Sequence, residues 1–543
     1  MSMIEYKDSI VIIDCGVQFT ESHTPGIDFI LPNTKYLEER KHKIKGMIIT
    51  HGHLDHIGAI PYIMPRIGNP TIYSRNFTSL MIRKRQEEFP YLDPLNINIV
   101  EKTDVITLGD LKVRFFGVSH AIPDSMGVAI ETVHGDVVFA GRLKLQSGSA
   151  VINDDDIHTY KDFENRKTLL LMSSSAYSET DGYAPPLPDI ETEIENIIKK
   201  AEGRVFFNAF STQMEKIVSL FQIAYDHKKK ITIDNKIYKK NVMSLLESSL
   251  ISTHTFDSVY VSIDTLQPTD IEDKDLIILS SAEDNNEFAT LNRIGAESHK
   301  IWILNETDTI VMGNTQVLGS ERKVQNLKDK LSRLGAHVIH MRTVDYNTSG
   351  YPFAGDLSYI HRKVQPQFFI PIHGYHYMLR VQADLARKGL AMDEKSVIIP
   401  DTGSIIEIRD AGSKMIALKE KAPSDLIVVD GMSVGKVQDV VLRDRQMLGE
   451  DGMFVVIGII DSHTHTLKRA PDIISRGFVY LKESQDLLFQ ARELCKVTIE
   501  SYLSSHSNYE VDDMRNEIAD VISKFLGQKT AKKPSIISVV ISV

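Results

Sequence analysis

Four metal-ligand side chains fall close together near the N-terminus and constrain the chain more than any other feature. A short apolar run that ends at Ile49 predicts a buried strand, and the loop directly after it carries His51, His53, Asp55 and His56. His51 and His53 are two positions apart in a turning loop, so both rings can face one metal, while Asp55 and His56 can hold a second. Imidazole and carboxylate ligands suit zinc or manganese. The pattern predicts a centre for one or two Zn²⁺ or Mn²⁺ ions, with a histidine-rich surface loop as the alternative.

Two further histidines stand at the ends of predicted strands. His120 follows the strand predicted at 111–116 and precedes a turn fixed by Pro123, and His373 follows the strand predicted at 367–371. Because zinc sites draw their ligands from several strand ends, we predict that both histidines complete the ligand set. Taken alone, each pattern favours an ordinary loop histidine, and the nearby metal loop reverses that preference. The histidines that lack such a context are predicted to be surface or structural residues: His42, His134, His254, His299, His337, His340, His361, His376, His463 and His465.

Length and composition set the broad class. A chain of 543 residues is too long for one core, and its 42% hydrophobic and 25% charged residues are typical of a globular protein. No run of eighteen apolar residues occurs, so no membrane span is predicted, and the polar start at 1–8 predicts no secretory signal. Cys15 and Cys495 frame no disulfide scaffold, which predicts a reducing, cytoplasmic location. The net charge of −11 argues against nucleic-acid binding by bulk charge, so any such binding must come from local basic patches or from a metal.

The predicted secondary structure changes along the chain. Strands separated by turn residues fill the first part and suit a sandwich of sheets. After three prolines near 185–188, helices alternate with strands, including one predicted at 300–303, which indicates an inserted α/β domain. The last part is predicted to be α+β and to begin with a strand at 437–443. The predicted boundaries are 1–187, 188–355, 356–415, a linker at 416–436, and 437–543.

The motifs together resemble those of the ribonuclease J family. The metal loop reads THGHLDHIGAIPY at 50–62, and it is accompanied by SHAIPDS at 119–125 and FIPIHG at 369–374. The metal loop alone would indicate only the metallo-β-lactamase superfamily. The C-terminal third adds the motifs that are specific to ribonuclease J: VDG at 429–431, VVLRDR at 440–445, DG at 451–452 and PDIISRGFVY at 471–480.

The resemblance implies a fold and an activity. The fold class is α/β: a metallo-β-lactamase αββα sandwich, an inserted β-CASP α/β domain and a small α+β C-terminal domain used in dimer or tetramer assembly. The activity implied is 5′-to-3′ exonuclease and endonuclease cleavage of RNA with two zinc or manganese ions. Asp55 and His56 would be catalytic as well as metal-binding. The retained metal ligands would be His51, His53, Asp55, His56, His120 and His373.

Several site positions depart from the family pattern. The chain has AGRLK at 140–144 where the family has TGDFK, so Arg142 stands where an aspartate bridges two metals. It has SSSA at 173–176 in place of SDST, so Ser174 replaces a carboxylate, and NTSGY in place of HVSGH, so Asn347 and Tyr351 replace histidines. The residues of that last motif that remain candidates for binding substrate phosphate are Asn347, Thr348, Ser349 and Gly350.

The change at Arg142 has an electrostatic consequence. Replacing a carboxylate by a guanidinium changes the local charge by two units beside two dications. At ~4 Å and an effective dielectric constant of about 20, each pair of unit charges is worth roughly 4 kcal/mol. The change therefore opposes the binding of two ions. The sequence leaves open whether the chain binds two ions, one ion or none. A guanidinium that turns outward, or that binds phosphate itself, is the alternative.

Three functions follow from these patterns. The first is a ribonuclease J-family subunit that binds RNA but cleaves it weakly or not at all, partnered with itself or with an active paralogue. The second is a working metal-dependent ribonuclease that tolerates Arg142. The third is a metallo-hydrolase that acts on a substrate other than nucleic acid. Basic runs at 83–85 and 236–240 are candidate RNA contacts, or else solvated faces.

Overall fold

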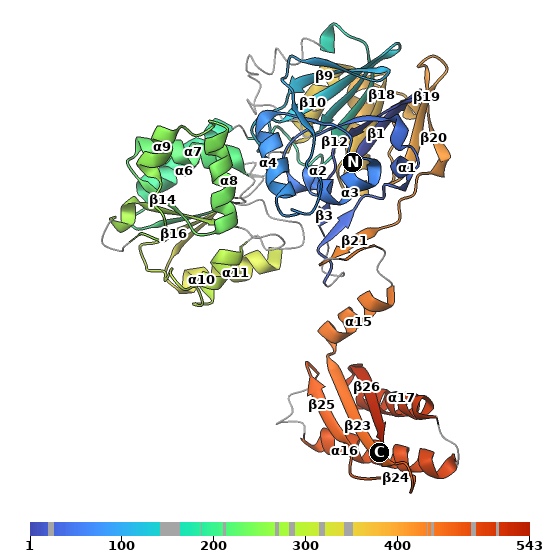
Figure 1. Cartoon of the computed structure of the whole chain (residues 1–543). Coiled ribbons are helices and arrows are strands. Elements are labelled where there is room, and N and C mark those ends of the chain that lie inside the picture. The colour runs from blue at the N-terminus through green and yellow to red at the C-terminus, as the bar shows by residue number, and fades with distance from the viewer. Residues whose placement is uncertain are drawn as a thin grey trace. The chain divides into compact units, whose positions relative to one another are not determined.

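The chain divides into two compact units, which are described separately. In the computed structural model the first unit comprises 1–17 and 32–425, and the second comprises 18–31 and 426–543 (Figure 1). The structure describes residues 1–19, 26–141, 163–185, 187–209, 213–266, 271–281, 288–313, 321–341, 351–431, 433–435, 439–478, 485–506 and 510–543.

Two β-sheets form the centre of the lactamase part of the first unit. One has the strand order β1-β2-β5-β6-β7 and the other has the order β18-β12-β11-β10-β9-β8. Their strands are β1 Ser2–Tyr6, β2 Ser9–Ile13, β5 Ile44–Ile48, β6 Ile72–Ser74, β7 Ile97–Ile99, β8 Val105–Leu108, β9 Leu111–Gly117, β10 Met126–Thr132, β11 Gly135–Gly141, β12 Thr168–Ser174 and β18 Phe368–Ile372. Residues of both sheets, such as Val11, Val113 and Phe139, share one buried apolar cluster, so the sheets form a sandwich.

Helices cover this sandwich and complete the αββα arrangement. On the outer face of the second sheet, Ile360 of α13 and Ala383 of α14 belong to one apolar cluster with Phe369 of β18. The helices and the remaining elements of this part are α1 Lys35–Glu38, η1 Lys41–Lys43, α2 Leu54–Ile57, α3 Ile60–Ile67, α4 Asn76–Gln86, α13 Ala354–Val364, α14 His376–Leu390, η3 Glu394–Ser396 and the hairpin β19 Ser404–Arg409 with β20 Lys414–Lys421.

The inserted part of the first unit is a parallel sheet with helices around it (Figure 1, green and yellow). Its strand order is β14-β15-β13-β16-β17, and every pairing is parallel. Its elements are α6 Leu187–Lys200, β13 Val205–Ala209, α7 Met214–Asp226, β14 Lys230–Ile233, α8 Lys236–Glu247, α9 Thr253–Val259, η2 Asp273–Asp275, β15 Leu276–Ser281, α10 Ala289–Gly295, β16 Thr309–Met312, α11 Glu321–Arg333 and β17 His337–His340. Strands such as β13 are buried along their whole length, as expected for a parallel sheet covered on both faces.

The second unit joins the short segment 18–31 to the C-terminal residues 426–543. Strand β4 pairs with β21 in a small sheet of order β22-β21-β4-β3. A second sheet is centred on β23, which pairs in parallel with β26, and α16 and α17 pack on one face of it. The elements are β3 Gln18–Phe19, β4 Phe29–Leu31, β21 Ile427–Asp430, β22 Ser433–Gly435, α15 Asp439–Glu450, β23 Met453–Asp461, β24 Thr466–Leu467, β25 Asp472–Arg476, α16 Gln485–Ser505, α17 Val511–Thr530 and β26 Ser535–Ser542.

Some predicted elements differ from the observed ones. The strand predicted at 437–443 is wrong, because α15 begins at Asp439; a short apolar run such as 440–442 does not distinguish strand from helix. The strand predicted at 300–303 is also wrong, and the sheet instead uses β16 at Thr309–Met312. The predicted linker at 416–436 contains the end of β20 and all of β21 and β22. For the parts of the first unit we propose the domain boundaries predicted from the sequence: 1–187, 188–355 and 356–415. No described helix is long and apolar enough to cross a membrane.

A buried ion pair fixes the inserted sheet. Arg204 donates from Nε to Oδ1 of Asp308 at 2.9 Å and from its terminal nitrogen to Oδ2 at 2.7 Å, and the Asp308 carboxylate is fully buried. We predict that Asp308→Ala lowers the free energy of unfolding by about 3–5 kcal/mol, because it leaves the guanidinium partly buried without its partner. Urea denaturation followed by circular dichroism measures the loss. The matched control is Asp329→Ala, which removes the exposed partner of Arg333 and should change nothing measurable. Equal losses in both variants would contradict the prediction.

Candidate metal centre

The metal loop lies where β5 ends, and the segment after β2 holds it in place. Cys15 donates its backbone N–H to the carbonyl of His56 at 2.8 Å, and Val17 donates to Leu54 at 3.2 Å. Gly16 lies between them, and a Cβ on it would come within 1.6 Å of the carbonyl oxygen of Asp55. Only glycine allows this approach of two backbones. The loop is therefore positioned by main-chain contacts on both sides.

Three of the predicted ligands come together. His51, His53 and His120 form a group whose candidate ligand atoms all lie within 4.8 Å of one another. Nε2 of His120 is 3.1 Å from Nδ1 of His53, and the His51 ring centroid is 4.6 Å from that of His120. His51 and His120 are buried and His53 is partly exposed. The three side chains, called the histidine triad below, come from two strand ends of different sheets.

The histidine triad fits a divalent metal. Two imidazole nitrogens on a tetrahedral zinc ion, each ~2.0–2.1 Å from it, would stand roughly 3.3 Å apart. The observed 3.1 Å between His53 and His120 is close to this edge length. Neutral imidazoles are also the ligands that zinc prefers. The arrangement can therefore hold one ion on three imidazoles and leave a further coordination position for substrate or solvent.

A buried carboxylate stands behind this loop and was missed by the sequence analysis. Asp14 Oδ2 is 2.7 Å from Nδ1 of His56, and Oδ1 accepts hydrogen bonds from the backbone N–H and the hydroxyl of Thr50 at 2.8 and 2.9 Å. The Thr50 hydroxyl in turn lies 3.0 Å from Nδ1 of His51. Burial acts to raise the pKa of Asp14, but His56 and the hydrogen bonds outweigh it and hold that pKa below its usual value. An acidic residue directly after the buried strand β2 was the available signal.

The comparisons with known proteins agree with this geometry. Three family models match: the metallo-beta-lactamase superfamily over 1–176, the ribonuclease J beta-CASP domain over 202–331 and the ribonuclease J C-terminal domain over 440–543. The chain belongs to the ribonuclease J family. It is 28% identical to "Ribonuclease J2" of Bacillus subtilis (strain 168), covering 100% of this chain and 96% of that protein. It is also 28% identical to "Ribonuclease J 2" of Staphylococcus aureus (strain MRSA252), with coverages of 99% and 95%.

The remaining predicted ligands of this ribonuclease J-family chain are arranged differently. Asp55 Oδ2 is 3.6 Å from Nε2 of His56, and the rings of His56 and His373 have their centroids 5.3 Å apart. Among the described residues these three do not form a ligand group as tight as the histidine triad. Nδ1 of His56 is occupied by Asp14, which leaves Nε2 for a metal. Their role as a second metal set, and that of Asp55 and His56 in catalysis, stays a prediction.

The positions that depart from the family pattern are only partly described. Ser174 is fully buried, and its hydroxyl lies 3.4 Å from the carbonyl oxygen of His373, to which it donates. The ring of Tyr351 has its centroid 6.3 Å from that of His120 and 5.5 Å from that of Tyr177. An aromatic ring therefore stands beside the histidine triad where the family has an imidazole. Arg142, Asn347, Thr348, Ser349 and Gly350 lie outside the described residues.

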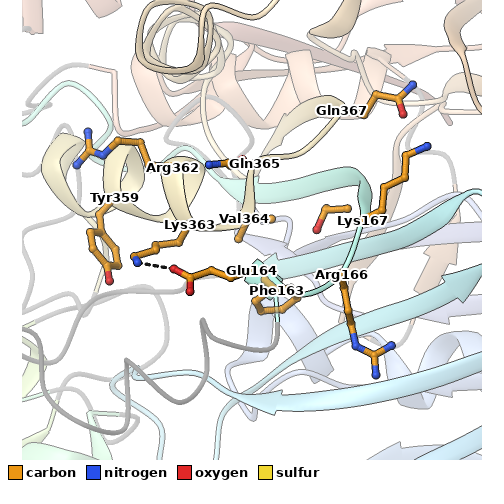
Figure 2. Close-up of a pocket in the computed structure, with 11 residues that line it drawn as sticks. Phe163, Glu164, Arg166, Lys167, Tyr359, Arg362, Lys363, Val364, Gln365 and Gln367 are labelled. Atoms are coloured by element: carbon orange, nitrogen blue, oxygen red, sulfur yellow. Dashed lines mark hydrogen bonds and ion pairs between the residues drawn. The ribbon is translucent and has the colours of Figure 1, made fainter.

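A separate hollow opens at the other end of the second lactamase sheet. Its volume is about 710 Å³, and its lining includes residues just before β12 and β18. The histidine triad and His373 instead follow strand ends, so this hollow is not the metal centre. Figure 2 shows Lys363 facing Glu164, with which it forms an ion pair. Lys167 and Arg362 also line it and, within the described ranges, their side chains make no ion pair.

We predict that His53→Ala lowers the affinity for Zn²⁺ by more than about 100-fold, since losing a ligand should cost more than losing an outer partner of one. Isothermal titration of the metal-stripped protein measures the affinity. The control is His42→Ala, which changes an exposed histidine and should leave Zn²⁺ binding as in the wild type. Equal affinities for both variants would mean that the histidine triad does not hold the ion.

Proposed function

We propose that this protein is an RNA-binding member of the ribonuclease J family that acts in RNA processing and decay and cleaves RNA weakly or not at all. The observation that carries the proposal is the loss of negative charge around a retained histidine triad. Arg142 and Ser174 stand where the family has carboxylates, and Asp55, His56 and His373 form no compact second group among the described residues. Without those carboxylates, a second dication lacks the charge that would offset its repulsion from the first.

The chain's own residues suggest how RNA would be handled. When bound to the histidine triad, a divalent cation would supply Lewis acidity toward a phosphoryl oxygen. Asp14 and Thr50 orient His56 and His51 through hydrogen bonds. Asp55 is the partly exposed carboxylate beside them, about one third exposed, and in this proposal it would accept a proton from an attacking water. The stretch 347–350 would hold the substrate phosphate.

An active metal-dependent 5′-to-3′ exonuclease and endonuclease is the second candidate. The intact histidine triad favours it, because three imidazoles on one zinc ion are enough for hydrolytic centres in other proteins. A single ion would then serve both RNA binding and cleavage. Positive surface for the RNA strand is available in the hollow that holds Lys167 and Arg362. The predicted RNA contacts at 83–85 and 236–240 are less available to RNA, because Lys84 forms an ion pair with Glu247 and Lys240 forms one with Glu87.

We also propose assembly through the C-terminal sheet, with a second copy or with an active paralogue. Strand β23 alternates buried and partly exposed residues, and its buried side packs on α16 and α17. On the other side, Ile474, Ile537 and Ile541 of the neighbouring strands are 43–45% exposed. Apolar side chains gathered on one sheet face are typical of an interface.

We also propose a cytoplasmic location, which agrees with the two cysteines, because both are buried free thiols.

Cleavage is tested with a 5′-monophosphorylated RNA in the presence of Mn²⁺. We predict that the wild-type chain binds the RNA with little turnover, and that Arg142→Asp combined with Asn347→His and Tyr351→His raises turnover at least about tenfold, because the bridging charge returns. The control adds His53→Ala to the triple variant and should remove the gain. Robust turnover by the wild type, abolished by His53→Ala, would replace the proposal by the second candidate.

Assembly is tested by light scattering coupled to size-exclusion chromatography. We predict that Ile537→Glu together with Ile541→Glu converts an oligomer into a smaller species, because the two charges on β26 would be desolvated in the interface. The control is Val133→Glu, at an 80% exposed position in the first unit, which should leave the mass unchanged. A wild-type monomer in the presence and absence of an active paralogue would contradict this part of the proposal.

A further inference from the structure

The histidine triad lies next to apolar side chains through which the lactamase part and the inserted part pack together. Ile122 and Phe77 are each 1% exposed and belong to the same apolar cluster as the core of the inserted part, with Met81 packed against it. The other members of that cluster lie in 190–341. Phe77, Met81 and Ile122, called the apolar seat below, are thus the lactamase residues that enter the insert's core.

The apolar seat is directly continuous with His120. Ile122 is two residues beyond it, and the carbonyl of Ala121 accepts a hydrogen bond from the backbone N–H of Glu215 at the start of α7, at 3.2 Å. The same turn is closed by Ser125, whose hydroxyl donates to the carbonyl of Ile122 at 2.7 Å. A backbone N–H of the inserted part and the Ser125 side chain of the turn itself therefore hold the segment that carries His120.

The metal loop touches the apolar seat as well. Gly52 stands between His51 and His53, and a Cβ on it would come within 2.4 Å of the Met81 sulfur. On the other side, Met126 donates its backbone N–H to the carbonyl of Thr50 at 3.0 Å, which ties the loop to the segment after His120. All three imidazoles are consequently borne by backbone that is packed against the apolar seat.

Helix α4, which carries Phe77 and Met81, is fastened at both ends. At its start, Asp124 accepts hydrogen bonds from the N–H of Phe77 at 2.6 Å and from the Thr78 hydroxyl at 3.2 Å. At its end, Lys84 donates to the carbonyl of Lys240 in α8 at 3.1 Å. Hydrogen bonds therefore connect the start of this helix to the turn after His120 and its end to the inserted part.

We propose that docking of the inserted part positions the histidine triad, so that metal affinity and docking are thermodynamically coupled, with Ile122 as the main positioning residue. The reason is that close-packed interiors pass displacements on rather than absorb them, while ligand distances in a metal site tolerate only about 0.2 Å. The coupling works in both directions, because linkage is reciprocal. An RNA strand that shifts the insert would thereby change how firmly the ion is held. The inference rests on the proposed metal centre.

The test compares two buried isoleucines of the same cluster. Ile122→Ala removes the contact beside His120, whereas Ile277→Ala makes a similar cavity on β15, also at 1% exposure. Both variants should lower the thermal midpoint. We expect Ile122→Ala to weaken Zn²⁺ binding about tenfold and Ile277→Ala to change it by less than about twofold. Ile122→Val should keep most of the wild-type affinity and serves if the alanine variant does not fold. Equal Zn²⁺ affinities for the two alanine variants would overturn the coupling.

A measurement without metal separates this inference from the metal centre itself. In the metal-stripped protein, hydrogen exchange of the amides at 118–126 should rise in Ile122→Ala and stay as in the wild type in Ile277→Ala. Added Zn²⁺ should slow exchange at the start of α7 in the wild type but not in His120→Ala. A wild type that binds no Zn²⁺ would remove the proposed metal centre, while equal exchange at 118–126 in both alanine variants would remove the coupling.

Discussion

The buried carboxylate of Asp14 joins the end of β2 to the metal loop that follows β5. It follows β2 and reaches across to Thr50, which follows β5, and to His56 in the first turn of α2. A carboxylate without partners at this depth would cost several kcal/mol, so the surrounding donors are required rather than optional. Because one oxygen bonds Thr50 and the other contacts His56, the carboxylate fixes both the start of the loop and a ring at its end. Gly16 then lets the backbone after Asp14 lie directly against Asp55.

The imidazoles and the carboxylates of the metal loop differ in how closely they gather. The imidazoles of the histidine triad keep a spacing that suits one zinc ion. Ser174, one of the positions that depart from the family pattern, lies buried and donates to the carbonyl of His373, which is a contact between neutral groups. Tyr351 adds a ring beside His120. This arrangement supports the proposal of a chain that binds RNA and cleaves it weakly or not at all.

The amino-acid pattern was sufficient for the family, the fold class and the coming together of the three histidines of the triad, because histidines at such short spacing after a strand leave few structural solutions. It was not sufficient for Asp14, since an aspartate after a strand is common and only the fold brings it to His56. It also missed the helix that begins at Asp439, where a short apolar run fits either kind of element. Ile122 packs into the insert's core, whose members begin at Ile190, 68 positions further along the sequence, and no local pattern encodes such a distant association.

The strand pairing inside the second unit has a consequence for synthesis. Gly431 donates its backbone N–H to Asp28 at 2.7 Å, across a separation of 403 positions, and β4 pairs with β21 over the same interval. At about 5–20 residues per second, a ribosome needs roughly 20–80 s to deliver the partner strand. During that time the nascent chain carries β4 with an open hydrogen-bonding edge, which is the kind of surface that chaperones shield and that misassembly exploits. Closing this small sheet is consequently a late event, which can occur only in chains whose translation has entered the last quarter of the sequence.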